Sequence, residues 1–355
     1  MTAPRLEIRL DRIRHNARAL VEHLGRRGIS VTGVTKATLG SPEIARELVA
    51  GGVRAIGESR IENIAALRAA GMTGPMTLIR SPMLSQVDRV VEHADTSLNT
   101  ELDVIHCLSV AAQARHEVHG VILMVELGDL REGILPGDLD AVVRETLGFP
   151  GIALRGIGTN LACQSGATPD ARNMAELSAL AASIETDHGI TLDVVSGGNS
   201  ANLDWAVGCD DVGRVNDLRL GESILLGREP RRRVAVEGLH TDAFTLVAEV
   251  IESKTKPTQP WGEINQTAFG PREPSPDHGD TARAILAVGR QDVDPEGLAA
   301  PVGFEILGAS SDHLVLDAGS RPPAVGAEVR FQLDYSALVR AMTSPFVERA
   351  FTPPD

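Results

Sequence analysis

Short apolar runs alternate with amphipathic stretches eight times between residues 28 and 227 of this 355-residue sequence. After residue 235 the helical spacing gives way to shorter alternating segments separated by Gly and Pro. Together these observations predict an α/β fold, a (β/α)8 TIM barrel followed by a C-terminal β-rich domain. A doubly wound open sheet would give a similar local pattern, and the count of eight favours the barrel.

The strands of the expected barrel are the apolar or β-branched runs. In chain order they cover residues 29–37, 53–59, 75–82, 94–100, 121–128, 153–160, 192–198 and 218–227. The stretches between them carry apolar residues at helical spacing, and several start at a Ser, Thr or Asp cap and close at a Gly. These expected helices cover residues 41–52, 61–71, 84–94, 101–115, 139–148 and 170–189.

The C-terminal part is predicted to form a second domain. Its expected β segments are residues 243–253, 282–289, 303–318 and 327–342. Residues 254–280, punctuated by Pro and Gly, are predicted to form a long loop of the kind that is often functional. We therefore expect a barrel domain over residues 11–234 and a β domain over residues 235–355, with a strand added to the latter by residues 1–10.

Composition limits the classes of function. The formal net charge of −14, without a run of Lys or Arg, argues against a nucleic acid or an anionic membrane as a partner. The first residues lack an apolar signal segment, and no stretch reaches the roughly 18 apolar residues of a membrane span, so we expect a cytoplasmic protein. Cys107, Cys163 and Cys209 lack metal-like spacing, so neither a metal site nor a disulfide framework is expected.

Lys36 is the only lysine among the first 253 residues, in a chain that otherwise uses arginine. It falls at the carboxyl end of the first expected strand, where barrel enzymes place their chemistry. An amine there can attack an aldehyde and form an imine, whereas arginine cannot lose its proton. A surface or phosphate-binding lysine is the alternative interpretation.

The segment "VVSGGNSAN" ends the seventh expected strand, and "RLGES" lies in the eighth. Loops after strands seven and eight of barrels often bind phosphate, through glycine-freed backbone amides and hydroxyls. Gly197, Gly198, Asn199 and Ser200, with Gly221 opposite, supply these groups, although ordinary turns use the same residues. With Lys36 across the barrel mouth, the loop suggests a phosphorylated aldehyde cofactor, pyridoxal 5′-phosphate.

A series of motifs extends this suggestion over nearly the whole chain. In order they are "VTKA", "ELGDLREGI", "GTNLAC", "SGGNSAN", "LRLGESILLG", "LAVGRQDV", "GASSDH" and "YSALVRAMTSP". As a set they resemble the barrel-type pyridoxal-phosphate enzymes that include alanine racemase, and most closely their ornithine-racemase-like branch. The resemblance implies a homodimer whose active sites are completed by the partner's β domain.

The resemblance also implies cofactor contacts. Lys36 would be the Schiff-base lysine, and Ser200 and the Gly221–Glu222 backbone would hold the phosphate. Arg219 would face the pyridine nitrogen. A guanidinium cannot give up its proton, so it would leave this nitrogen unprotonated, weaken the cofactor as an electron sink and suit fast loss and return of the α-proton. Pairing of Arg219 with Asp217 or Glu222 is the purely structural alternative. The further contacts implied are Asn160 in place of a family histidine, Ser196, Gly198, Asn199, Thr343 and Ser344.

On the substrate side, Arg131 matches the position that holds the substrate carboxylate. Arg290 stands where the family has the partner subunit's catalytic tyrosine, and Asp292 lies close to it. Because arginine is a poor proton shuttle, a second acid/base must act if two bases are used. His313, Asp312 and Cys163 are the candidates, His313 slightly favoured, with a turn histidine and a buried thiol as the bland alternatives.

Two features bear on the substrate. Met124 replaces a lysine that is carbamylated in alanine racemases, which speaks against alanine. Acidic residues near the expected mouth could pair with the cationic side chain of ornithine or lysine, or could orient the arginines. They are Glu58, Glu126, Asp129, Glu222 and Asp292.

We therefore expect a pyridoxal-phosphate-dependent racemase of ornithine or another basic amino acid. A lyase or aldolase acting on D-amino acids is the first alternative, although its zinc-dependent forms need a late His-x-Cys pair and this chain has no cysteine after Cys209. A non-catalytic carrier is disfavoured by the C-terminal residues that follow the barrel. A catalytically degenerate cofactor-binding protein is the remaining alternative.

Overall fold

The computed structural model describes residues 2–271, 276–277, 279–320 and 322–352. The chain forms two compact units. One is Asp11–Thr241, and the other combines Met1–Leu10 with Asp242–Asp355. Each unit is described by itself below.

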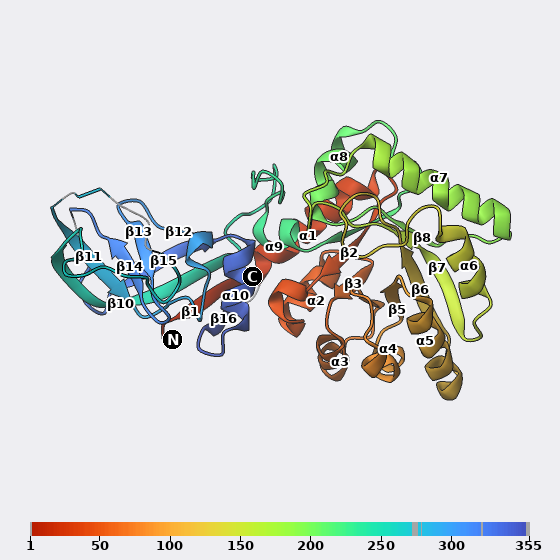
Figure 1. Cartoon of the computed structure of the whole chain (residues 1–355), viewed down its shortest axis with the longest axis horizontal. Coiled ribbons are helices and arrows are strands. Elements are labelled where there is room, and N and C mark those ends of the chain that lie inside the picture. Colours follow the sequence, from red (N-terminus) through yellow and green to blue (C-terminus); the bar gives the residue numbers. More distant parts are fainter. Residues whose placement is uncertain (1, 272–275, 278, 321, 353–355) are drawn as a thin grey trace. The chain divides into compact units, whose positions relative to one another are not determined.

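The first unit is the predicted closed parallel barrel, drawn in the warm and green colours of Figure 1. Its strands, each overlapping an expected run, are β2 (Ser30–Val34), β3 (Ala55–Glu58), β4 (Met76–Leu78), β5 (Thr96–Asn99), β6 (His119–Met124), β7 (Ile152–Gly158), β8 (Val194–Ser196) and β9 (Asp217–Leu220). Pairing of β9 with β2 closes the ring. All carboxyl ends therefore meet at one mouth, which gathers side chains from distant parts of the chain.

Helices surround this barrel (Figure 1). They are α1 (Leu10–Gly25), α2 (Pro42–Ala50), α3 (Ile61–Ala69), α4 (Val87–His93), α5 (Leu102–Arg115), α6 (Leu139–Leu147), α7 (Ala171–His188), α8 (Leu203–Gly208) and α9 (Glu222–Leu226). The expected strand over residues 218–227 is wrong beyond Leu220. The amides of Ile224 and Leu225 bond to the Gly221 carbonyl and start α9, so strand β9 ends at Leu220.

The division between the units falls after Thr241, later than the expected boundary after residue 234. Residues 235–241 contact the barrel instead. Ala235 forms a β-bridge with Arg228, and the Asn16 side chain of α1 donates to the carbonyls of Ile224 and His240. These bonds attach the connecting segment to the last helix of the barrel.

The second unit is a β-rich domain, as predicted. Its strands are β1 (Arg5–Arg9), β10 (Phe244–Pro257), β11 (Asp280–Leu286), β12 (Leu298–Ala299), β13 (Glu305–Ala309), β14 (Leu314–Asp317), β15 (Glu328–Leu333) and β16 (Glu348–Thr352), with helix α10 (Tyr335–Thr343). The order β12-β15-β10-β11-β14-β13 forms the sheet path, and β1 pairs with both β10 and β16. The N-terminal strand therefore lies within the sheet of the C-terminal residues.

Two expected elements of this unit differ in extent. The long loop over 254–280 is shorter, because β10 continues to Pro257 and β11 starts at Asp280; residues 272–275 and 278 lie outside the described residues. The segment 327–342 divides at Asp334, whose carboxylate accepts from the Ala337 amide and caps α10. Among the described residues, no helix is long and apolar enough to cross a membrane.

Candidate functional site

Strand β2 ends at Val34, and Thr35 caps a short 3-10 turn over Lys36–Thr38 that begins with Lys36. The Lys36 side chain is exposed and makes no hydrogen bond or ion pair with another described residue. Thr35 is fully buried, and its hydroxyl donates to Glu58 Oε2 at 3.0 Å. The buried neighbour thus fixes the backbone from which a free amine projects.

Glu58 ends β3 and is fully buried. Its other oxygen, Oε1, accepts from the amides of Ser59 at 2.6 Å and Arg60 at 3.2 Å. Burial raises the pKa of Glu58, and these bonds and the one from Thr35 oppose the rise. Since both oxygens serve the strand ends, Glu58 is a structural partner of the Lys36 turn rather than a group open to a substrate.

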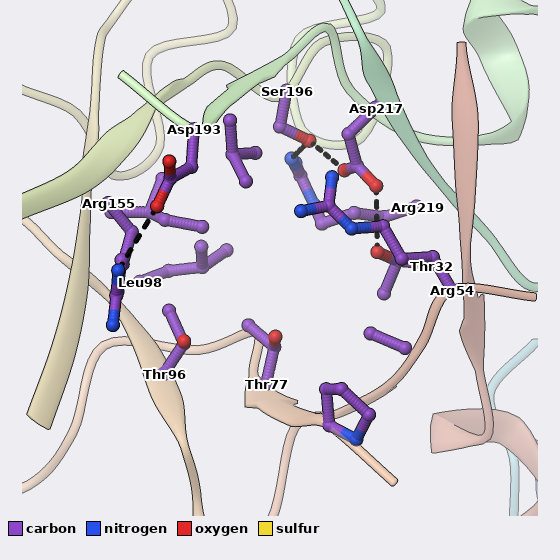
Figure 2. Close-up of a pocket in the computed structure, with 14 residues that line it drawn as sticks. Thr32, Arg54, Thr77, Thr96, Leu98, Arg155, Asp193, Ser196, Asp217 and Arg219 are labelled. Carbon is purple, nitrogen blue, oxygen red and sulfur yellow. Dashed lines mark hydrogen bonds and ion pairs between the residues drawn. The ribbon is translucent and has the colours of Figure 1, made fainter. Parts of the chain in front are cut away.

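Arg219, on β9, lies in a chain of polar side chains inside the barrel (Figure 2). Its Nη1 donates to Ser196 Oγ at 2.5 Å, and the same hydroxyl donates to Asp217 Oδ2 at 2.7 Å. Asp217 Oδ1 accepts from Thr32 Oγ1 at 2.8 Å. Within the part of the chain that the structure describes, Arg219 and Asp217 form no direct ion pair, and Ser196 links them.

The other end of the Arg219 guanidinium reaches the segment that follows β7. Nη2 donates to the Thr159 carbonyl at 2.8 Å and to Asn160 Oδ1 at 3.3 Å. Burial lowers the pKa of Arg219, and the charge of Asp217 opposes this. Because the ordinary pKa of arginine lies far above neutral pH, Arg219 keeps its positive charge despite this lowering.

Asn160 leaves one buried donor unused. Its Oδ1 accepts from Arg219 and, at 3.1 Å, from Asn199 Nδ2, whereas its Nδ2 is buried without a hydrogen-bond partner among the described residues. An unmade buried bond costs about 1 to 3 kcal/mol, so a ligand acceptor at this point would be stabilising. The arrangement fits a polar ring held beside Arg219.

The loop after β8 has the geometry of a small cradle. Gly198 has a φ of 139°, which side-chain-bearing residues rarely adopt, and Asn199 caps the following turn through the Ala201 amide at 2.8 Å. The hydroxyls of Ser200 and Ser223 lie 3.0 Å apart. At Gly221 an added Cβ would lie 3.2 Å from the Cβ of Val34. Two hydroxyls and a glycine therefore lie near the end of β2, the strand that precedes Lys36.

Arg131 and Cys163 lie together on neighbouring loops. Arg131 Nη1 is 3.5 Å from Cys163 Sγ, and Arg131 Nε pairs with Glu132 Oε2 at 2.6 Å. The thiol is exposed, which excludes the interpretation of Cys163 as a buried core cysteine. Buried Asp129 joins the two loops, because its carboxylate accepts from the amides of Cys163, Gln164 and Ser165 at 3.0 to 3.3 Å.

The predicted residues of the second unit form their own contacts. Arg290 pairs with Glu296 at 2.5 Å, and its guanidinium lies 5.2 Å from the centroid of the Phe269 ring. Asp292 is buried and accepts from Ser344 Oγ at 2.8 Å. Since Asp292 also accepts from the Gly289 amide at 3.3 Å, it organises the turn that carries Arg290.

Asp312 and His313 form the exposed turn between β13 and β14. His313 Nδ1 lies 2.9 Å from Asp312 Oδ1. Thr343 Oγ1 donates to the Arg340 carbonyl at 2.8 Å, at the end of α10. The structure thus brings together the predicted residues of the barrel unit, and separately those of the β unit.

Of the other acidic residues, Glu126 accepts from the amides of Gly128 at 2.5 Å and Arg131 at 3.3 Å. Glu126, like Asp129, therefore shapes the loop that presents Arg131. Met124 is buried against Leu98 and Ile122 in the barrel core. Among the described residues, no group of three or more His, Cys, Asp or Glu side chains is arranged to hold a metal ion.

Sequence reasoning missed three residues of the site: Thr35, Thr159 and Ser223. Thr35 and Thr159 directly follow barrel strands, and this position alone could have marked them as site residues. Ser223 lies in "RLGES", which was assigned to a strand, so its place in the first turn of α9 was hidden.

Known proteins share this architecture. A family model described as alanine racemase, N-terminal domain, matches residues 8–229. The chain belongs to the alanine racemase family. This family member is 40% identical to a lysine racemase of Thermotoga maritima over 99% of both chains. It is 36% identical to an ornithine racemase of Acetoanaerobium sticklandii, over 98% of this chain and 99% of that one.

Solved structures show the fold of the family. An alanine racemase from D-cycloserine-producing Streptomyces lavendulae superposes with a TM-score of 0.80 at 20% identity, covering 99% of this chain and 98% of that chain. A D-threonine aldolase from Filomicrobium marinum gives 0.73 at 15% identity, covering 96% and 89%. Because a racemase and an aldolase share this fold, the fold alone does not choose the reaction.

Proposed function

We propose that this family member is a pyridoxal-phosphate-dependent racemase that interconverts the L and D forms of basic amino acids. The observation that carries the proposal is the unpaired Lys36 amine at the barrel mouth, in a chain similar along its whole length to a lysine racemase and an ornithine racemase. These relatives support lysine and ornithine as the substrates to test first.

The barrel unit offers groups for each part of the cofactor. Lys36 would bind the aldehyde carbon, and Ser200 with the backbone of Gly221 and Glu222 would hold the phosphate. Arg219 and the unused Asn160 donor would face the ring. When bound, pyridoxal phosphate acidifies the α-hydrogen of an attached amino acid.

The proton steps need one group on each face of the α-carbon. Lys36 Nζ would take and return the proton on one face. Arg131 would hold the substrate carboxylate through its guanidinium fork. Cys163 Sγ, 3.5 Å from Arg131 Nη1 and exposed, would serve the opposite face. Because Arg219 keeps its proton, it would leave the pyridine nitrogen unprotonated, which would weaken the ring as an electron sink and favour return of the proton to the α-carbon.

His313, which the sequence slightly favoured, is the other candidate for the second proton. Its Nδ1 lies 2.9 Å from Asp312 Oδ1, and this contact orients the ring. It belongs to the β unit, and in the proposed homodimer that unit would complete the partner's barrel. Cys163 is preferred because it lies in the same unit as Lys36 and touches the predicted carboxylate-binding arginine.

A racemisation screen tests the function. Purified protein supplied with pyridoxal phosphate is incubated with each enantiomer of lysine, ornithine, arginine, alanine and serine, and products are resolved by chiral chromatography. We expect turnover of lysine or ornithine to exceed that of alanine by at least about tenfold. Cofactor binding without racemisation of any of these would contradict the proposal.

The Lys36→Ala variant tests the site. It should lose activity by about a thousandfold or more, as expected when a covalent group that also transfers protons is removed. After borohydride reduction, intact mass should show the cofactor added to the wild type and absent from the variant. The exposed Lys254→Ala change is the matched control and should retain both properties. Retention of the adduct by the Lys36 variant would show that another residue binds the aldehyde.

A further inference from the structure

A polar cavity of about 280 Å3 lies at the amino-terminal end of the barrel, opposite the mouth that carries Lys36 (Figure 2). Ala55, Thr96 and Asp217, which line it, are the first residues of β3, β5 and β9. Lys36, in contrast, lies beyond the last residue of β2. The cavity is therefore distinct from the proposed amino-acid site.

The cavity exists because inward-facing side chains are small at this level. Barrels are usually filled by layers of branched side chains. Here the lining positions include Thr32, Ala55, Thr77 and Thr96. The next layer, with Leu98, Ile122 and Met124 packed together, is apolar and buried. A hole with hydroxyl walls is left beneath it, and polar holes of this size hold water or a ligand.

The charges in the wall leave a positive excess. Three arginines and two aspartates line the cavity: Arg54, Arg155, Arg219, Asp193 and Asp217. Asp193 pairs with Arg155 at 3.1 Å. Each carboxylate oxygen of Asp217 already accepts a hydrogen bond from a hydroxyl, one from Thr32 and one from Ser196.

Arg54 supplies the charge that is not balanced. Its side chain extends into the cavity, toward the level of Ser196 and Asp217 (Figure 2). Among the described residues it makes no side-chain hydrogen bond or ion pair. A guanidinium placed in a concave polar site and left without a protein partner is suited to a small oxyanion, since it offers paired donors in a fixed fork.

We propose that this cavity is a binding site for a small oxyanion, a short-chain carboxylate or inorganic phosphate, held by Arg54 with the hydroxyls of Thr77 and Thr96. Arg219 lines the inner end of the same cavity while its Nη2 donates to the Thr159 carbonyl at the mouth. An anion in the cavity therefore lies on the opposite side of the residue proposed to face the cofactor ring.

Isothermal titration calorimetry on the full-length protein, in a buffer of low anion content, tests the site with acetate, propionate and phosphate separately. Binding of one of them at millimolar or tighter affinity is expected, and the pattern identifies the source of the oxyanion. Arg54→Ala should weaken this binding about tenfold or more, as loss of a charge-assisted bond implies. Arg54→Lys, which keeps the charge, should retain part of it.

Arg172→Ala removes an exposed arginine on α7 and is the matched control; it should bind as the wild type does. A second titration in the presence of saturating lysine separates the two ends of the barrel, and the anion affinity should persist. Absence of anion binding up to tens of millimolar, equal binding by Arg54→Ala, or displacement of the anion by lysine would each overturn the proposal. None of these readouts depends on racemase activity.

Discussion

Adjacent residues at the end of β2 have opposite surroundings. Thr35 is buried and bonded to Glu58, whereas Lys36 is exposed with a free amine. A lysine side chain alone is flexible, so a reactive position depends on a rigid attachment point. The polar chain of Arg219, Ser196 and Asp217 provides similar rigidity on the other side of the barrel.

At the residue scale, Cys163→Ala tests the second proton carrier. In solvent D2O or from α-deuterated substrate, exchange from one enantiomer should fall by about a hundredfold or more, while exchange from the other, through Lys36, stays within about tenfold. Mass spectrometry of each enantiomer follows the label. Cys107→Ala should be neutral. A one-sided loss in His313→Ala, with normal exchange in Cys163→Ala, would assign the role to the histidine instead.

His119, at the start of β6, gives a second residue-scale prediction. Burial lowers its pKa to about 4, and its Nε2 lies 2.8 Å from Ser97 Oγ. The folded state therefore disfavours the charged ring, so its contribution to stability is present above pH 6.5 and is lost as the pH falls toward 4. Unfolding free energy should drop by about 2 kcal/mol from this group between pH 7 and pH 5.

Chemical unfolding at the two pH values measures this drop. His119→Phe should flatten the pH dependence, while the exposed His106→Gln on α5 should leave it intact. An unchanged slope in the phenylalanine variant would show that other groups cause the acid sensitivity. The comparison uses slopes, so it does not depend on the variant's absolute stability.

At the element scale, the loop after β8 combines a strained backbone with a capped turn. Gly198→Ala would place a Cβ 2.3 Å from Asn202 Oδ1, at a φ of 139°. We expect a loss of about 1 to 3 kcal/mol in stability and weaker cofactor retention, because Asn202 Oδ1 would have to leave the Asn199 amide. Thermal unfolding and cofactor titration measure the two effects. Gly208→Ala, with open space around it, should cause neither.

The other elements show which boundaries the local sequence pattern could predict. Each barrel strand was predicted from its apolar run, because a strand buried on both faces needs such a run. The predicted end of β9 was wrong, because the apolar "SILL" is compatible with a strand or a helix. The hydrogen bonds to the Gly221 carbonyl form the helix instead. The predicted boundary between the two domains was also early, because Asn16 of α1 binds the connecting segment.

At the scale of the whole molecule, the N-terminal strand belongs to the C-terminal unit. Leu6 and Ile8 of β1 are fully buried between β10 and β16. Leu6→Ala should therefore lower the stability of the β unit by about 2 to 5 kcal/mol. Hydrogen exchange resolved by peptide should show faster exchange in β10 and β16. Val325→Ala, at an exposed position, should change stability by less than about 0.5 kcal/mol.

The proposed homodimer is also a property of the whole molecule. We expect sedimentation equilibrium to give twice the 37.6 kDa chain mass. If His313 acts in the partner's site, Lys36→Ala and His313→Ala subunits are each inactive alone, and mixing them should restore part of the activity. If Cys163 carries the second proton, as proposed, His313→Ala is active by itself. The experiment thus connects assembly with the choice of the second proton carrier.

The sequence by itself determined the barrel, the second β domain and the lysine at the first strand end, because these follow from local periodicity and from residue type at a strand terminus. It also pointed to Arg219, Asn160 and the loop after β8, through resemblance to a family. Only the tertiary structure decided which groups touch. Closure of the barrel brings Asp129 to the Cys163 loop, links Arg219 to Asp217 through Ser196, and leaves the cavity around Arg54. Such contacts join strands that lie tens of residues apart, and no local pattern encodes them.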